Sequence, residues 1–334
     1  MKFLSIPAWM LILLALSTVQ ATAQPGGKTP ATLEEISRSL VHLRAEIPAS
    51  ARTAKFLGQR REGNGVVIGD KGLILTIGYL ILEANRIEVV THQGKTFPAR
   101  VVGYDPNSGF GLLSANVPLG VPALALGDSN RLAVKDPALV ITAGKEDPIG
   151  AVQVVSVRTF AGYWEYLLEG AIFVSPPRRN YAGAALVDKT FHLVGIGSLF
   201  VQDSLRKGGK LPGNMFVPIN RIKPVLSALI RTGGPGTPPK PWLGVNVAEQ
   251  FGRLIVTRVS RDGPASASGL AAGDIILEIA GKKVDTLERF FRELWRQGKP
   301  GVSVRLKVLQ GNTVKSVSVK SRDRSLHYRG KTWN

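Results

Sequence analysis

Side chains that could carry out acyl transfer lie close together in one stretch of the sequence. Ser175 and Ser198 offer hydroxyl nucleophiles, and His192 offers an imidazole that could accept a proton. Hydrolysis of an amide by serine needs both groups and a carboxylate that orients the imidazole. Serine and histidine in strand and turn segments are more often hydrogen-bonding surface groups, so a displaced triad remains only an alternative here.

The sequence shows no pattern for a metal or another cofactor. It contains no cysteine, which excludes disulfides, thiol catalysis and thiolate metal sites. A histidine that stands alone in a strand usually has a structural role. None of the four histidines follows a metal-ligand spacing such as HExxH; they are His42, His92, His192 and His327.

Short apolar runs separated by turn residues fill the segment from about residue 63 to residue 213. Their residues are β-branched or alternate between apolar and polar, which is typical of strands. The spacing of the runs predicts an all-β barrel or sandwich. The runs are VVIG, LILTIGYLIL, RIEVVTHQGKTFPARVVGYD, ALVITAG, VQVVSVRTF, YLLEGAIFV and HLVGIGSLFV.

Two helices are expected beside these strands. Thr32, with Glu35 three residues on, predicts a capped short helix at the start of the segment 33–43. The segment 219–232 changes to helical spacing and ends at Gly233. One face of this second helix would carry Ile222, Val225, Leu226 and Leu229.

A second, smaller module follows a Gly/Pro linker at residues 233–241, GGPGTPPKP. Strands are expected at 243–248 and 254–259, and a helix at 287–297. Asp285, with Glu288 three residues later, is the expected cap of this helix, and Gly298 its stop. A hairpin with Gly311-Asn312 as its turn completes a compact α+β module.

The first 23 residues indicate export. Lys2 precedes the apolar run 3–19, and Ala21-Thr22-Ala23 forms a small-x-small cleavage site. A membrane anchor is the alternative, but the run contains Pro7 and is short for a hydrocarbon core of ~30 Å. We therefore expect a signal peptide at 1–23, a flexible leader at 24–32 and a cysteine-free protein of the bacterial periplasm.

The net charge of +19 favours anionic partners, such as envelope polymers, lipid head groups or acidic peptides. Small basic clusters occur at Arg206-Lys207-Lys210 and in the tail from Lys320 to Lys331. Aromatic residues are not interleaved with the basic ones, so no nucleic acid is expected as a partner. A solvated basic surface is the simpler interpretation of the same charge.

Several motifs resemble, in order, the HtrA/Deg family of periplasmic serine proteases. GNGVVIGDKGLILTIGYLIL resembles the family's histidine segment, LALGDSNRLAVKDPALVITAG its L-x-LGDS segment, and MFVPINRIKPVLSALIRTG its terminal strand and helix. The resemblance implies a mainly β fold, with a trypsin-like double antiparallel β-barrel followed by a small α+β PDZ domain. It places these domains at 33–232 and 242–321, with a basic tail at 322–334.

The same resemblance implies that the catalytic triad is missing. Tyr79 stands at the family's histidine position, Gly109 at its aspartate position and Ala182 at its serine position. Alanine cannot attack a carbonyl, and a neutral phenol of pKa about 10 is a poor proton acceptor. Asn180 stands where the family's oxyanion loop has glycine, which puts that loop in doubt as well.

The PDZ domain of the family implies a peptide site in the second module. Trp242-Leu243-Gly244-Val245 resembles the family's YIGI-type loop, whose N–H groups bind a terminal carboxylate while the next strand pairs with the peptide. Leu287, Phe291 and Leu294 would line the helical wall of the groove, or pack in the core instead.

Three hypotheses follow. The first is a catalytically inactive homologue that binds C-termini of peptides or unfolded proteins through its PDZ domain. It could form homo-oligomers or hetero-oligomers with related proteases. The second is an active serine endopeptidase with a displaced triad. The third is an envelope protein that binds anions through its net positive charge.

Overall fold

A computed structural model describes residues 32–69, 71–115, 117–144, 148–205 and 210–328. The expected signal peptide, the leader up to residue 31, Arg206-Lys207 and the chain beyond residue 328 lie outside the described residues. Within the described ranges, no helix is long and apolar enough to cross a membrane.

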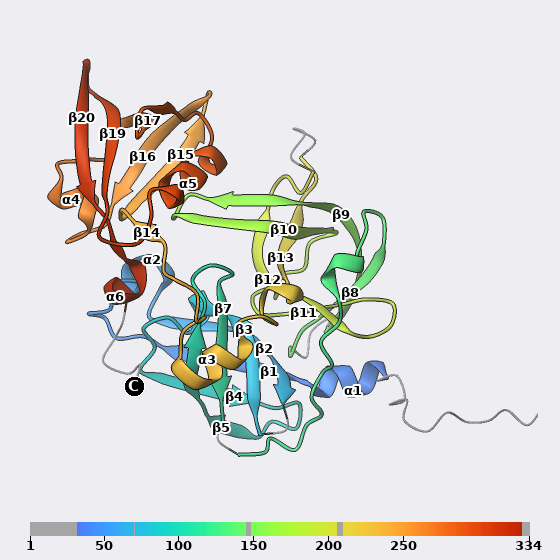
Figure 1. The fold of residues 1–334 in the computed structure, drawn as a ribbon. Coiled ribbons are helices and arrows are strands. Elements are labelled where there is room, and N and C mark those ends of the chain that lie inside the picture. Colours follow the sequence, from blue (N-terminus) through green and yellow to red (C-terminus); the bar gives the residue numbers. More distant parts are fainter. Residues whose placement is uncertain (1–31, 70, 116, 145–147, 206–209, 329–334) are drawn as a thin grey trace, which may run out of the picture. The chain divides into compact units, whose positions relative to one another are not determined.

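The first half forms a seven-stranded antiparallel sheet with the order β5-β4-β1-β2-β3-β7-β6 (Figure 1). It is preceded by α1 (Leu33–Arg38), which has the predicted capping box between Thr32 and Glu35. The helix α2 (Ala54–Leu57) and the 3₁₀-helix η1 (Gly78–Leu80) lie between strands. The strands are β1 (Leu40–Glu46), β2 (Arg60–Gly69), β3 (Leu73–Ile77), β4 (Arg86–Val90), β5 (Thr96–Pro98), β6 (Arg100–Tyr104) and β7 (Phe110–Ser114).

The next six strands close into a barrel in the order β10-β13-β12-β11-β8-β9. The longest two, β9 and β10, form one antiparallel hairpin whose turn contains Glu165 at φ +54°. The barrel strands are β8 (Pro137–Ile141), β9 (Ile149–Gly162), β10 (Tyr166–Ser175), β11 (Ala185–Val187), β12 (Leu193–Val201) and β13 (Gly213–Pro218). The fold is therefore mainly β and of the trypsin-like class, as expected from the resemblance.

The helix expected at 219–232 is only partly present. Residues Ile219–Arg221 form the 3₁₀-helix η3, and the α-helix α3 begins at Leu226 and ends at Thr232. Pro224 explains the interruption, because it lacks an N–H and disfavours helical geometry in the preceding residue. Gly233 ends α3 in a left-handed conformation, as predicted. A second 3₁₀-helix, η2 (Ser129–Arg131), precedes β8.

The C-terminal module has a five-stranded sheet path, β15-β16-β17-β19-β20, with β18 paired to β17. Its helix α5 (Leu287–Arg296) is capped by Thr286, whose hydroxyl accepts from the N–H of Arg289. Asp285 was the wrong choice for this cap, because its carboxylate pairs with the Arg289 guanidinium instead. The other elements are β15 (Val245–Gln250), β16 (Arg253–Val259), α4 (Pro264–Ala267), β17 (Ile275–Ile279), β18 (Lys282–Lys283), β19 (Ser303–Gln310) and β20 (Thr313–Lys320).

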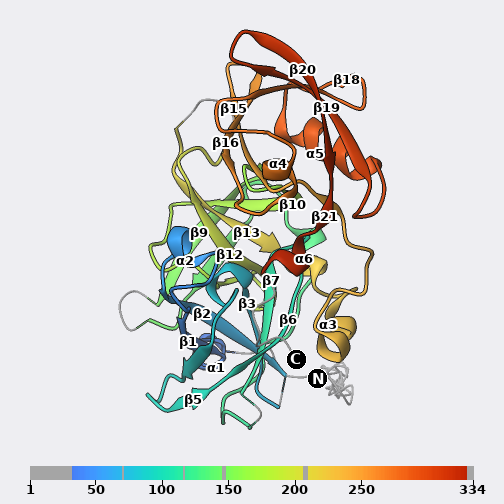
Figure 2. The same ribbon diagram turned by 90° about the vertical axis from the view of Figure 1, so that its left-hand side faces the viewer.

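The first residues of the expected basic tail are folded onto the start of this module. After β20 the chain continues through β21 (Arg322–Asp323) into α6 (Arg324–Tyr328), as Figure 2 shows. Strand β21 pairs with β14 (Pro241–Trp242), and the His327 ring lies 4.6 Å from the Trp242 ring. The two ends of the module are thereby joined, and Trp242 is 4% exposed.

Candidate functional site

Tyr79, at the expected histidine position, lies in η1 directly after β3. Its phenol Oη donates to the carbonyl oxygen of Ser198 on β12 at 2.9 Å. Burial raises the pKa of this phenol well above its ordinary value, and the nearby Tyr181 raises it further. Tyr79 is therefore a protonated hydrogen-bond donor at neutral pH rather than a proton acceptor.

Gly109, at the expected aspartate position, precedes β7 with φ +83°. Its carbonyl accepts from the N–H of Gly78 at 2.7 Å, which places it directly beside η1. The nearby carboxylate of Asp105 is engaged in its own turn, where it accepts from the N–H of Asn107 and from the N–H and hydroxyl of Ser108. Asp105 is 3% exposed, so this turn holds the carboxylate in place.

Ala182, at the expected serine position, lies in the loop between β10 and β11. Asn64 of β2 fastens this loop: its side-chain amide donates to the carbonyls of Asn180 and Ala182 at 2.8 and 2.9 Å. Its backbone N–H also donates to the Ala182 carbonyl at 2.8 Å, and its Oδ1 accepts from Ala143 N–H at 2.8 Å. Gly183 is confined to glycine, because a Cβ there would stand 2.0 Å from the Asn64 carbonyl oxygen.

Asn64 is not among the site residues that the sequence motifs predict. A signal was present, because Asn64 is a polar residue between two glycines, directly before the apolar run VVIG of β2. In the structure Asn64 is 2% exposed, so its amide needs partners within the protein. Its partners are distant in sequence, which is why the pattern alone did not reveal them.

Ser175 and His192, two residues of the alternative triad, have other side-chain partners. The Ser175 hydroxyl donates to the Pro212 carbonyl at 2.9 Å, and the His192 Nδ1 lies 3.0 Å from the Thr190 hydroxyl. Among the hydrogen bonds of the described residues, none joins His192 to Ser175 or Ser198. The described residues also contain no group of three or more His, Asp or Glu side chains that could hold a metal ion.

The loop expected to bind a carboxylate surrounds one in this structure, and the carboxylate belongs to Glu165. The N–H of Leu243 donates to Oε2 at 3.0 Å, and those of Gly244 and Val245 donate to Oε1 at 2.6 and 2.9 Å. Gly244 has φ +82°, which turns successive N–H groups toward one point. Trp242 does not take part in these hydrogen bonds; its backbone belongs to β14, and its ring packs against His327 and Tyr328 of α6.

Glu165 is 5% exposed, and its environment changes its acidity. Loss of water raises the pKa of its carboxyl group to about 7, despite the lowering effect of the three N–H donors and of the Arg324 guanidinium. The guanidinium of Arg324 also donates to the Glu165 carbonyl oxygen at 3.2 Å. One wall of an adjoining cavity of about 230 Å³ is formed by Glu165 and Trp242.

The three side chains expected on the helical wall of the groove are all buried. Leu287 is 7% exposed, and Phe291 and Leu294 are fully buried. They belong to the apolar core of the module, and Leu167 of β10 belongs to the same cluster. A packing role is therefore shown for all three, while contact with a peptide remains a prediction.

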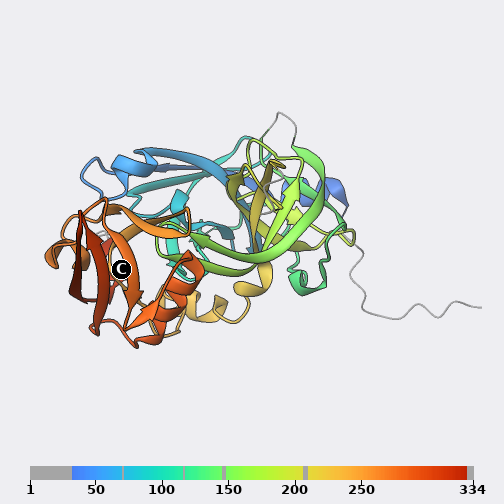
Figure 3. The ribbon, with the colours of Figure 1, turned by 90° about the horizontal axis from the view of Figure 1, so that it is seen from above.

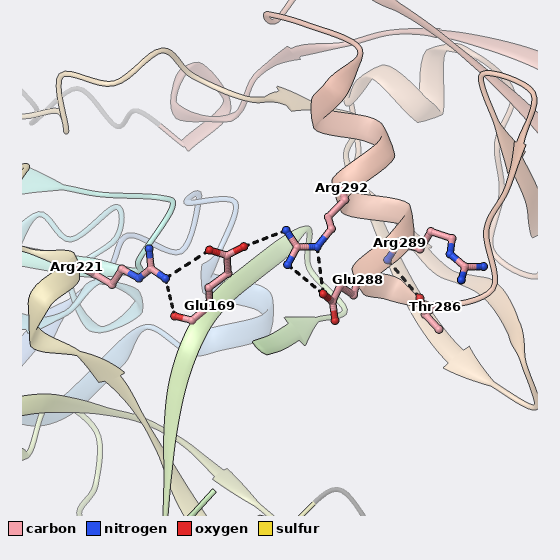
Figure 4. A network of polar contacts seen from close by, with 6 residues as sticks. All are labelled: Glu169, Arg221, Thr286, Glu288, Arg289 and Arg292. Carbon is pink, nitrogen blue, oxygen red and sulfur yellow. Dashed lines mark hydrogen bonds and ion pairs between the residues drawn. The ribbon is translucent and has the colours of Figure 1, made fainter. Parts of the chain in front are cut away.

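A polar network links β10 to α5 on the surface (Figure 4). The Glu169 carboxylate of β10 pairs with the Arg292 guanidinium of α5 at 2.9 Å, and Arg292 also bonds Glu288 at 3.0 Å. Arg221 of η3 donates to the Glu169 carbonyl at 2.8 Å. These side chains are partly exposed, so each pair contributes only about 0–1 kcal/mol.

Comparison with known proteins agrees with this architecture. Residues 63–196 match the trypsin-like peptidase domain family, and residues 241–321 match the PDZ domain family. The chain is 27% identical over 277 residues to a probable periplasmic serine endoprotease DegP-like of Halomonas elongata, covering 78% of this chain and 56% of the relative. A serine protease Do-like HtrA of Lactobacillus helveticus is 26% identical, with coverage of 67% and 60%.

Solved structures share the fold. The HtrA-type protease AlgW with decapeptide superimposes with a TM-score of 0.53 at 22% identity, covering 87% of this chain and 97% of that one. The serine endoprotease from Yersinia pestis gives a TM-score of 0.50 at 21% identity, with coverage of 89% and 99%. The chain spans between half and two thirds of the length of the curated relatives described above, at 56% and 60%.

Proposed function

We propose that this protein is a catalytically inactive homologue of serine proteases and binds peptides or proteins through its PDZ domain. The proposal starts from a chain that joins a trypsin-like peptidase domain to a PDZ domain and has DegP-like and HtrA-type relatives. The observation that carries the proposal is chemical. The positions expected to hold the triad contain a hydrogen-bond-donating phenol, a glycine and an alanine.

Inactivity follows from what these groups can do. Ala182 has no nucleophile, and Gly109 has no side chain to orient a base. Tyr79 keeps its proton because burial raises its pKa. In serine proteases, loss of the nucleophile alone costs on the order of 10⁶ in turnover, so loss of all three groups leaves no practical hydrolysis.

The experiment treats purified protein with a fluorophosphonate probe and with unfolded casein, alongside a DegP-like relative as the positive control. We expect neither covalent labelling nor cleavage by the wild-type chain. The Ala182→Ser variant should also remain unlabelled, because the new hydroxyl has no imidazole to accept its proton. Labelling of the wild-type chain at any serine would establish the displaced-triad alternative and end this proposal.

Peptide binding is supported by the backbone geometry of the module. Three consecutive N–H groups already coordinate a carboxylate, and the adjoining strand β15 has an edge that can accept an extended chain. The ligands we infer are C-termini of peptides or unfolded proteins, and a related protease is a further possible partner. Periplasmic location belongs to the same proposal, since the DegP-like relatives are described as periplasmic.

A further inference from the structure

The turn between β9 and β10 contacts the PDZ module in the manner of a bound peptide. We define the hairpin tip as residues 163–167. From two directions, Figures 1 and 3 show the green hairpin ending beside the orange helix α5. Hydrogen bonds from two residues of the tip define the arrangement. The Glu165 carboxylate accepts hydrogen bonds from the N–H groups of residues 243–245, and the Tyr163 carbonyl accepts one from the N–H of Val247 at 2.8 Å.

These two contacts correspond to the two parts of peptide recognition by strand addition. A terminal carboxylate binds to the loop N–H groups, and a carbonyl a little upstream pairs with the strand that follows the loop. Here the side-chain carboxylate of Glu165 takes the first place, and the backbone of Tyr163, two residues earlier, takes the second on β15. A chain that enters from outside needs the same donors.

Apolar packing adds to the polar contacts. Leu167 is 8% exposed and lies in the core cluster that includes Leu243, Phe291 and Leu294. Burial removes the apolar surface of this side chain from water and so favours the docked hairpin. The hairpin tip therefore brings an apolar anchor as well as a carboxylate, as a peptide ligand would.

Two further contacts hold the hairpin against the module. Arg324 of α6 donates to the Glu165 carbonyl at 3.2 Å, and Glu169 pairs with Arg292 of α5 at 2.9 Å. The first comes from the folded part of the tail, and the second from the helix that forms the groove wall. Both must be separated when the hairpin leaves.

We propose that the hairpin tip is an internal ligand of the PDZ groove, in which the Glu165 side chain takes the place of a terminal carboxylate, so that an external C-terminus binds only after the hairpin leaves. The inference rests on the proposed peptide-binding function. It adds autoinhibition to that function. If the open form holds a fraction f of the molecules, the apparent dissociation constant is the intrinsic one divided by f. One open molecule in about a hundred would weaken binding about a hundredfold.

Hydrogen exchange of the full chain tests the docking without a ligand. We expect the amides of Leu243, Gly244, Val245 and Val247 to exchange at least about tenfold faster in Glu165→Ala than in the wild-type protein. Glu62→Ala is the matched control, because it makes the same substitution at an exposed glutamate of β2, outside the hairpin, and should leave these amides protected. Unchanged exchange in Glu165→Ala would refute the docking.

Global unfolding of Glu165→Ala would appear as faster exchange in barrel strand β12 too. Glu165→Met then decides, because it keeps the length of the side chain and removes both acceptor oxygens. A local increase at residues 243–247 supports the internal ligand, and no increase refutes it.

Peptide binding separates this inference from the proposed function. The probe is a fluorescein-labelled pool of randomised decapeptides with a free terminal carboxylate, and the control is the same pool as carboxamides. We expect the carboxylate pool to bind Glu165→Ala at least about tenfold more tightly than the wild-type chain. Equal affinities overturn the internal ligand and leave peptide binding intact. Failure to bind either protein, with exchange still showing an opened groove, overturns peptide binding while docking stands.

Discussion

One asparagine fixes the loop that would carry a nucleophile. Asn64 makes three side-chain hydrogen bonds to backbone groups, and two of them go to the loop that contains Ala182. These bonds join β2 of the seven-stranded sheet to segments of the closed barrel, and the asparagine is 2% exposed. Removal of its amide would leave buried polar groups without a partner, which is one of the costly changes in a protein interior.

Asn64→Ala should lower the free energy of unfolding by about 1–3 kcal/mol, because the carbonyls of Asn180 and Ala182 lose the donor. Urea unfolding followed by circular dichroism measures the change. Asn130→Ala, at an exposed position, serves as the control and should change stability by less than about 0.5 kcal/mol. Coincident unfolding curves for Asn64→Ala and the wild-type chain would show that the loop does not depend on this amide.

At the scale of elements, the β9–β10 hairpin links the two domains and carries the buried carboxyl of Glu165. Its pKa is raised from the ordinary 4.5 to about 7 in the docked state. The released side chain would regain its ordinary pKa, so docking takes up a proton between pH 4.5 and 7. Docking is therefore strongest below pH 4.5 and weakens as the pH rises through 7.

We predict that the groove opens with rising pH. The ratio of open to docked molecules should increase by up to about tenfold per pH unit between pH 5 and 7. The carboxylate peptide pool should bind the wild-type chain more tightly at pH 8 than at pH 5.5, and fluorescence anisotropy measures this. Glu165→Gln should show no such dependence. A wild-type affinity that is constant over this range, or an equal dependence in the Gln variant, would contradict the assignment to Glu165.

Other titratable groups around Glu165 bear on the same pH range. The pKa of His327 in α6 is lowered to about 4 by burial, so this ring is neutral between pH 5 and 8. Burial also lowers the pKa of Lys240 in the linker. The titratable or charged groups that line the cavity beside Glu165 are Tyr104, Tyr166, Lys240, Asp323, Arg324 and Tyr328.

For the molecule as a whole, the segment 322–328 packs against the start of the PDZ module. Strand β21 pairs with β14, and α6 covers the Trp242 ring. The same helix carries Arg324, which bonds the hairpin. We therefore expect the segment 322–328 to stabilise both the module and the docked hairpin.

Truncation after Ser321 should lower the thermal midpoint of unfolding, because exposure of Trp242 costs about 1.5–3 kcal/mol. It should also increase binding of the carboxylate peptide pool, since Arg324 is removed. Differential scanning fluorimetry and anisotropy provide the two measurements. Truncation after Tyr328 is the matched control and keeps β21 and α6. If both truncated chains melt with the wild-type protein, the supporting role of this segment is wrong.

Local patterns predicted several elements correctly. The capping box of Thr32 and Glu35 and the stop at Gly233 depend on neighbours in the chain, and both are present. The cap of α5 was assigned to Asp285, one residue too early, since two adjacent residues could each fill that role. Helix α3 starts later than predicted because of Pro224. This proline is a local signal, but the periodic apolar spacing received more weight in the prediction.

The sequence by itself determined the order of the elements, the resemblance to HtrA-type proteases and which residues stand at the three expected triad positions. All of these depend on local spacing and residue type. Only the tertiary structure decided what those residues touch. Glu165 lies 78 residues before Leu243, and Asn64 lies 116 before Asn180. Such contacts leave no periodic trace in the chain, because a hydrogen bond depends on where two segments meet in space and not on the propensity of either segment.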